Sequence, residues 1–173
     1  MKRLALLLLV SLVSLSAFAA DARKVTTVIL VRHAEKAATP GNDPALSEAG
    51  AARAKELARV LAASGVTAIY TTQFARTQQT AAPLGAALNV TPVVLTAGGS
   101  YATDLAKRIR DTHAGATVLV VGHSNTTIEV MKSLGATNLP SIPESQFDDL
   151  FICTLVDGAP AKVVALRYGN VTR

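Results

Sequence analysis

The chain has 173 residues, of which 50% are hydrophobic and 17% charged, and this composition suits a single globular domain with one core. The formal net charge is +5, but the Lys and Arg residues are not clustered and no aromatic residues are interleaved with them. This pattern argues against a nucleic-acid-binding protein. The single cysteine, Cys153, excludes an internal disulfide, so the folded chain depends on its core.

The first 20 residues have the pattern of a secretory signal peptide. Two basic residues precede a run of Leu, Val and Ala, and small residues close the segment. Only about a dozen apolar residues are uninterrupted, fewer than the roughly 20 that cross a bilayer, which disfavours an uncleaved anchor. We predict a signal peptide over residues 1–19, cleaved about Ala19/Ala20, with a second site after Ala22. The mature protein is then periplasmic or secreted, and it meets a membrane only during export.

The first strand of the mature chain is predicted within residues 28–36, VILVRHAEK. Four consecutive apolar residues, three of them β-branched, are typical of a strand buried on both faces of a parallel sheet. The strand ends in Arg32 and His33, at the edge where such sheets place their ligand sites. A fixed cation beside an imidazole that titrates near neutral pH favours binding of an anion, phosphate above all. The alternative is a strand that simply ends in polar residues at the surface.

Apolar periodicity and turn residues define the elements that follow. Ser47 is a predicted N-cap for a helix over residues 48 to about 64, which Gly65 ends. Later strands are predicted over 66–71, 93–95 and 117–121, and later helices over 75–88, 101–112 and 125–134. The chain closes with a hairpin signal, Asp157-Gly158, between strands over 150–156 and 161–167.

Strands that alternate with helices of about 10 to 15 residues predict βαβ units. We therefore expect an α/β fold: a three-layer α/β/α sandwich whose central sheet is mostly parallel, with helices on both faces and the closing hairpin as an antiparallel edge. Residues 24–173 are predicted to form one domain, because they contain no internal repeat, low-complexity tract or linker. Cys153 lies in an apolar run and is expected to be a small buried hydrophobe, not a nucleophile.

Two further strand ends carry residues that suit an anion site. One strand leads into a helix that carries Arg76, and another ends next to His123. If these strands are parallel neighbours of the first, both residues converge with Arg32 and His33 in one cleft. Clustered cations repel one another unless an anion lies between them, so the pattern predicts a binding site.

Three motifs resemble the histidine phosphatase superfamily, which has the phosphoglycerate mutase-like fold. They are RHAEK at 32–36, TTQFARTQQTA at 71–81 and VGHSNT at 121–126. The resemblance implies that His33 is the nucleophile that takes up a phosphoryl group, and that Arg32, Arg76 and His123 bind its oxygens. Asn125 begins the predicted helix after the last motif; capping is its default role, with a phosphate contact as the alternative.

With the predicted signal peptide, the resemblance implies a small exported phosphatase. Neither a metal nor another cofactor is expected, since the arginines and His123 supply the positive charge. Such an enzyme hydrolyses a phosphate ester or anhydride through a phosphohistidine on His33. A neutral imidazole that attacks phosphorus splits one difficult step into two, and arginine offers planar donors that stay charged. The expected partner is a small phosphorylated substrate; neither nucleic acid nor a protein partner is implied.

The proton donor for the leaving group departs from the family's patterns. In mutase-like members the donor is a glutamate shortly after the second arginine, but no Asp or Glu lies between Arg76 and Asp104. In the acid-phosphatase branch an aspartate follows the second histidine, and this chain has Ser124 there. The missing glutamate argues against phosphoglycerate mutase-type transfer, as does export.

Glu35 is the candidate proton donor, because it follows the nucleophile by two residues. The alternative is that Glu35 only pairs with Lys36, Arg53 or solvent. Asp104 and Glu144 are further candidates for the same role.

Two function classes remain beside the phosphatase. A metal-dependent hydrolase would use His33, His113, His123 and carboxylates, but it lacks the close His and Asp spacings of metal sites. A non-catalytic phosphate-binding or envelope protein would keep the motifs without turnover. Outside the motifs, His113 is predicted at a helix C-terminus, and Glu144, Asp148 and Asp149 are predicted to form a solvated rim.

Overall fold

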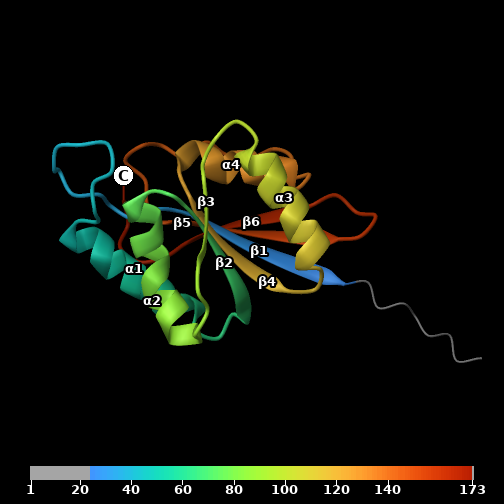
Figure 1. Cartoon of the computed structure of the whole chain (residues 1–173). Helices are drawn as coiled ribbons and strands as arrows, with labels where there is room; N and C mark the ends of the chain where they lie inside the picture. The colour runs from blue at the N-terminus through green and yellow to red at the C-terminus, as the bar shows by residue number, and fades with distance from the viewer. Residues whose placement is uncertain (1–23, 173) are drawn as a thin grey trace, which may run out of the picture.

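The computed structural model describes residues 24–172, and the predicted signal peptide with its cleavage site lies outside them. Six strands and four helices follow one another along this part of the chain (Figure 1). In order they are β1 (Val25–Arg32), α1 (Glu48–Leu61), β2 (Val66–Thr72), α2 (Ala75–Leu88), β3 (Val93–Leu95), α3 (Tyr101–Thr112), β4 (Thr117–Gly122), α4 (Ser124–Ser133), β5 (Asp149–Val156) and β6 (Lys162–Arg167).

The strands form one mixed sheet in the order β3-β2-β4-β1-β5-β6. The first four of these are parallel to one another, whereas β5 and β6 are antiparallel to their neighbours. The predicted mostly parallel α/β sheet with a closing antiparallel hairpin is confirmed. Gly158 has a φ of +75° in the hairpin turn, a conformation that favours glycine.

Helices cover both faces of the sheet, α1 and α2 on one side and α3 and α4 on the other (Figure 1). Successive side chains of β1 point to opposite faces, so Val28 and Leu30 pack in the core on the α3 and α4 side. Ile29 and Val31 pack in the core beneath α1 and α2. This explains the unbroken apolar run of β1, which has no solvent-facing side in its second half. Cys153 on β5 is fully buried in the core on the α3 and α4 side, as expected.

Local signals set the helix ends close to their predicted positions. Ser47 caps α1, because its Oγ accepts a hydrogen bond of 3.1 Å from the backbone N–H of Gly50. The helix ends at Leu61, three residues earlier than predicted, and Gly65 then leads into β2 with a φ of +72°. The other predicted helices begin and end within one residue of their observed limits.

The sheet register brings three strand ends together. Arg32, the last residue of β1, pairs with Gly122, the last residue of β4, and Thr71 of β2 pairs with the residue just before Gly122. Because β2, β4 and β1 are parallel neighbours, the loops that follow them leave from one edge of the sheet. Within residues 24–172, none of the helices has the length and apolarity needed to span a membrane.

Candidate active site

His33 lies directly after β1 and is almost fully buried, at 4% exposure. Its backbone N–H donates to the carbonyl of Gly122 over 2.9 Å, which ties the residue to the end of β4. The ring Nδ1 lies 2.8 Å from the carbonyl oxygen of Ala34. A carbonyl oxygen only accepts hydrogen bonds, so Nδ1 carries the hydrogen and Nε2 keeps a free lone pair.

Arg32 is 3% exposed and is held by the loop between α4 and β5, residues 134–148, which we call the α4–β5 loop. Its Nη1 donates to three backbone carbonyls of this loop, those of Pro143, Glu144 and Gln146, over 2.9, 2.9 and 3.1 Å. The guanidinium stacks on the ring of Phe147, 4.4 Å from its centroid. The side chain is thereby fixed before any ligand binds.

His123 is the N-cap residue of α4, and its backbone N–H donates to the Thr126 hydroxyl over 2.8 Å. Its Nε2 lies 3.0 Å from the Thr72 hydroxyl at the end of β2. Its ring meets that of His33 edge to face, with 5.3 Å between the centroids. The two histidines that the sequence places 90 residues apart are therefore neighbours.

Arg76 lies in the first turn of α2 and stacks on Phe74, with its guanidinium carbon 4.3 Å from the ring centroid. Its Nη2 approaches Nδ1 of His123 to 3.5 Å. Its Nη1 lies 3.5 Å from a carboxylate oxygen of Asp43, which also accepts from the backbone N–H of Ala75 over 2.9 Å. Asp43 thus takes the place of the N-cap side chain that Phe74 does not supply. Sequence reasoning missed Asp43, which lies in a loop without a motif.

A cavity of about 350 Å³ brings these residues together. Arg32, His33, Arg76 and His123 all line it, as the strand-end argument predicted for their positions. The other lining residues are Lys36, Phe74, Ala97, Ser124, Asn125, Thr126 and Glu144. Two arginines and the N-terminus of α4 face a small volume, which is the environment that an oxyanion requires.

Burial lowers the pKa of both histidines. The pKa of His33 falls to about 3, chiefly through burial and then through the nearby charges of Arg32, His123 and Arg76. The pKa of His123 falls to about 4, again chiefly through burial and then through Arg76 and Arg32. Both rings are therefore neutral at pH 7, and the lone pair on Nε2 of His33 is available for attack.

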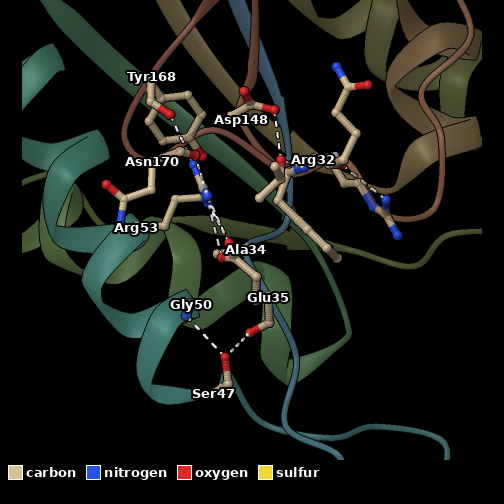
Figure 2. A network of polar contacts seen from close by, with 12 residues as sticks. Arg32, Ala34, Glu35, Ser47, Gly50, Arg53, Asp148, Tyr168 and Asn170 are labelled. Carbon is tan, nitrogen blue, oxygen red and sulfur yellow. Dashed lines mark hydrogen bonds and ion pairs between the residues drawn. The ribbon is translucent and has the colours of Figure 1, made fainter.

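Glu35 does not line this cavity, which corrects the expectation that it is the proton donor. Its carboxylate accepts from Nε and Nη2 of Arg53 over 3.0 and 2.7 Å (Figure 2). Arg53 is 5% exposed and also donates to the backbone carbonyls of Tyr168 and Asn170. The pairing with Arg53, the alternative given for Glu35, is the one that the structure contains.

The backbone explains why Glu35 turns away from the cavity. Its carbonyl accepts from the backbone N–H of Ser47 over 2.9 Å, which holds the residue against the start of α1. The approach is so close that a Cβ at Gly50 would lie 2.1 Å from the carbonyl oxygen of Glu35. The side chain therefore reaches along α1 to Arg53, 18 residues later in the chain.

Glu144 is the one acidic residue among residues 24–172 that lines the cavity. One carboxylate oxygen lies 2.6 Å from Nη2 of Arg32, and the other accepts from the Ser124 hydroxyl. Its side chain is 77% exposed. The hydrogen bond from Ser124, followed by the charge of Arg32, lowers the pKa of Glu144 despite the opposing effect of desolvation.

The other acidic candidates do not line the cavity. Asp104 lines a separate cavity beside α3. Asp148 and Asp149 are 2% and 6% exposed, so the prediction that they form a solvated rim is wrong. Both pair with Arg167 over 3.0 Å, because β6 lies against the start of β5 and offers a cation there.

The remaining predicted residues have structural contacts. His113 follows α3 and lies 2.8 Å from the Tyr70 hydroxyl, ahead of β4 and thus at the opposite edge of the sheet from His123. Asn125 lines the cavity from the first turn of α4, where its side chain contacts Glu129 over 3.4 Å. Among residues 24–172 no three His, Cys, Asp or Glu side chains are grouped so that they could hold a metal ion.

Comparison with known proteins agrees with the motifs and the fold. Residues 28–98 match the family model of the histidine phosphatase superfamily (branch 1), a segment that contains Arg32, His33 and Arg76. None of the curated proteins matches the sequence.

Solved structures with the same fold include the protein histidine phosphatase SixA complexed with tungstate, with a TM-score of 0.65 and 18% identity over 82% of this chain and 96% of that one. A mycobacterial glucosyl-3-phosphoglycerate phosphatase has a TM-score of 0.64 and 15% identity over 84% of this chain and 100% of that one. A SixA protein from Agrobacterium tumefaciens reaches 29% identity over 81% of this chain and 97% of that one, with a TM-score of 0.56. Residues 28–98 are therefore similar to branch 1 of the histidine phosphatase superfamily, and the chain shares the fold of these solved structures.

Proposed function

We propose that the protein is a metal-independent phosphatase that hydrolyses a phosphate ester or anhydride through a phosphohistidine on His33. The observation that carries this proposal is the free Nε2 lone pair of a neutral, buried His33 in a cavity that it shares with Arg32 and Arg76. Homologues in the superfamily are phosphatases, which agrees with this assignment.

The phosphoryl group would be bound by Arg32, Arg76 and the N-terminus of α4. Within the described residues, the Nε atoms of both arginines are buried without a hydrogen-bond partner. A bound oxyanion supplies the missing acceptors, and Arg matches its oxygens with paired donors. A dianion beside His123 also favours the protonated ring, so its Nδ1 gains a hydrogen to donate to the phosphoryl group.

In the first step, Nε2 of His33 attacks phosphorus; an N–P bond forms as the bond to the leaving oxygen breaks. The Nδ1 hydrogen bond to Ala34 orients the ring and stabilises the positive charge that develops on it. In the second step water attacks phosphorus, the N–P bond breaks, and inorganic phosphate and neutral His33 are released. The arginines stabilise negative charge on the phosphoryl oxygens in both steps, without rearrangement of Arg32.

The experiment is rapid quenching of the mature protein with a ³²P-labelled acyl phosphate. We expect acid-labile, alkali-stable label on His33, turnover that resists chelators, and inhibition by vanadate. His33→Ala should lose both label and turnover, whereas His113→Gln should retain them because His113 lies at the opposite edge of the sheet. Label on another residue, or full turnover by the His33 variant, would overturn the mechanism.

The same assay separates the alternatives. A mutase-type enzyme passes the phosphoryl group to a second hydroxyl, so labelled ester would appear in place of inorganic phosphate. A non-catalytic phosphate-binding protein would bind vanadate but leave no label on His33. Loss of turnover on chelation would instead favour the metal-dependent hydrolase.

We also infer that the protein is exported, on the pattern of its first 20 residues alone. Sequencing of the N-terminus of the protein purified from the periplasm or medium should find Ala20 as the first residue. A product that retains Met1 in the membrane fraction would contradict cleavage.

A further inference from the structure

Glu144 occupies a distinctive position at the mouth of the cavity. Its carboxylate has two polar partners, the Arg32 guanidinium at 2.6 Å and the Ser124 hydroxyl. Both partners line the same cavity, and the side chain is otherwise open to solvent, at 77% exposure. This carboxylate is therefore the anion that pairs with the proposed phosphate-binding arginine in the structure.

A phosphoryl group bound at Arg32 changes the surroundings of this carboxylate. The dianion takes over donors that now serve Glu144, and it places negative charge within a few ångströms of it. Both changes favour the protonated carboxyl. A like charge disfavours ionisation, and losing the Ser124 hydrogen bond and the Arg32 charge removes the contacts that lower the pKa of Glu144. The exposed side chain stays at the cavity mouth because its own backbone carbonyl accepts from Arg32 over 2.9 Å.

The other carboxylates near the site are committed elsewhere. Glu35 is held by Arg53, and Asp43 accepts hydrogen bonds from the α2 N-terminus. Asp148 and Asp149 are buried against Arg167. Among residues 24–172, Glu144 is the one acidic residue that lines the cavity, and its side chain is exposed to solvent.

We propose that Glu144 is the catalytic proton donor to the leaving group in the first step and the proton acceptor from water in the second. This inference rests on the phosphatase function proposed for His33. As the P–O bond breaks, the carboxyl proton passes to the leaving oxygen, which departs as a neutral alcohol, and Glu144 becomes a carboxylate. In the second step that carboxylate takes one proton from the attacking water, which restores the carboxyl group as the N–P bond breaks.

An acid at position 144 would favour one class of substrate. An acid at the cavity mouth matters most for a basic leaving oxygen, as in alkyl phosphate monoesters, because an alkoxide is a poor leaving group. Acyl phosphates and aryl phosphates with electron-withdrawing groups leave readily as anions. We therefore expect alkyl phosphate monoesters to be the substrates that depend on Glu144.

The test is Glu144→Gln, with Glu129→Gln as the matched control. Glu129 is an exposed glutamate on α4 that lies outside the cavity lining. The value of kcat/KM is measured for p-nitrophenyl, phenyl and alkyl phosphates. We expect Glu144→Gln to lower kcat/KM for alkyl phosphates by about 10²- to 10⁴-fold, and to leave that for p-nitrophenyl phosphate within about tenfold. Glu129→Gln should match the unsubstituted protein throughout.

Several results separate this inference from the proposed function. Glu144→Gln should still take label on His33 from an acyl phosphate, and should hydrolyse the phosphohistidine more slowly, so labelled protein accumulates. Equal losses across the ester series, or none for alkyl esters, would overturn the role of Glu144 while leaving the His33 mechanism intact. Circular dichroism should show the same folded state for both variants, since each side chain is exposed.

Discussion

The pair between Glu35 and Arg53 offers the sharpest test of how the loop after His33 is held. The change is Glu35→Gln, which keeps the shape of the side chain and removes its charge. Arg53 then retains the carbonyls of Tyr168 and Asn170 but loses the anion that balances its buried guanidinium. Breaking a buried pair by removing one partner costs about 3–5 kcal/mol.

The structure places the expected cost near the lower end of this range. The Arg53 side chain is 3% exposed but that of Glu35 is 19% exposed, so water reaches one side of the pair. We expect a loss of about 3 kcal/mol in the free energy of unfolding, which corresponds to about 6–12 °C in Tm for a domain of this size. Urea and thermal unfolding followed by circular dichroism measure both values. The double variant Glu35→Gln/Arg53→Met should be more stable than Glu35→Gln, because it removes the unbalanced charge.

Activity supplies the second readout for the same variant. If Glu35 has only a structural role, Glu35→Gln should keep the same ratio of kcat/KM between p-nitrophenyl and alkyl phosphates at a temperature where it is folded. A selective loss for alkyl esters would return the proton-donor role to Glu35. A change in unfolding free energy below about 0.5 kcal/mol, the range of ordinary surface substitutions, would refute the reasoning about the buried pair.

Gly50→Ala should destabilise the protein by about 1–3 kcal/mol and lower kcat, because the new Cβ would lie 2.1 Å from the carbonyl oxygen of Glu35. Gly98→Ala is the control and should be neutral, because no atom lies within 4 Å of a Cβ at that position. Asp43→Ala should cost about 1 kcal/mol and raise KM severalfold, since it removes the α2 cap and the contact with Arg76; equal KM values would contradict this. The pKa of His33 lies below its ordinary value of 6.5, so the unfolded chain binds more protons and stability should fall as pH drops from 6.5 toward 3. At about pH 5 the loss in the free energy of unfolding amounts to about 2 kcal/mol. In His33→Gln the free energy of unfolding, measured by urea titration at each pH, should fall less steeply as the pH drops.

Most of the fold could be predicted because its signals are local. The apolar run before Arg32 is unbroken where β1 is covered on both faces, and Ser47 and Gly65 mark the limits of one helix region. The convergence of Arg32 and His123 needed only the assumption that their strands are parallel neighbours, and the register confirms it.

The errors concern contacts between distant segments. Glu35 has three plausible partners in the sequence, and only the packing of α1 against its carbonyl directs it to Arg53. Asp148 and Asp149 look like loop residues until β6 brings Arg167 beside them. No periodicity or turn signal encodes these pairings, because they depend on how loops meet after the sheet has formed.

The α4–β5 loop links the packing of distant segments to the proposed function. Three of its carbonyls hold Arg32, and the same loop carries Glu144. Since Arg32 is fixed through backbone contacts, Glu144 can leave it without releasing the guanidinium, so the proposed phosphate-binding group stays in place while the proposed acid moves. Substitution of the Glu144 side chain should therefore leave the Arg32 backbone contacts intact, whereas shortening the loop should disturb phosphate binding and proton transfer together. Vanadate affinity, measured for both variants, tests this expectation. If the shortened loop weakens vanadate binding and the Glu144 substitution does not, phosphate binding and proton transfer are separable in this site.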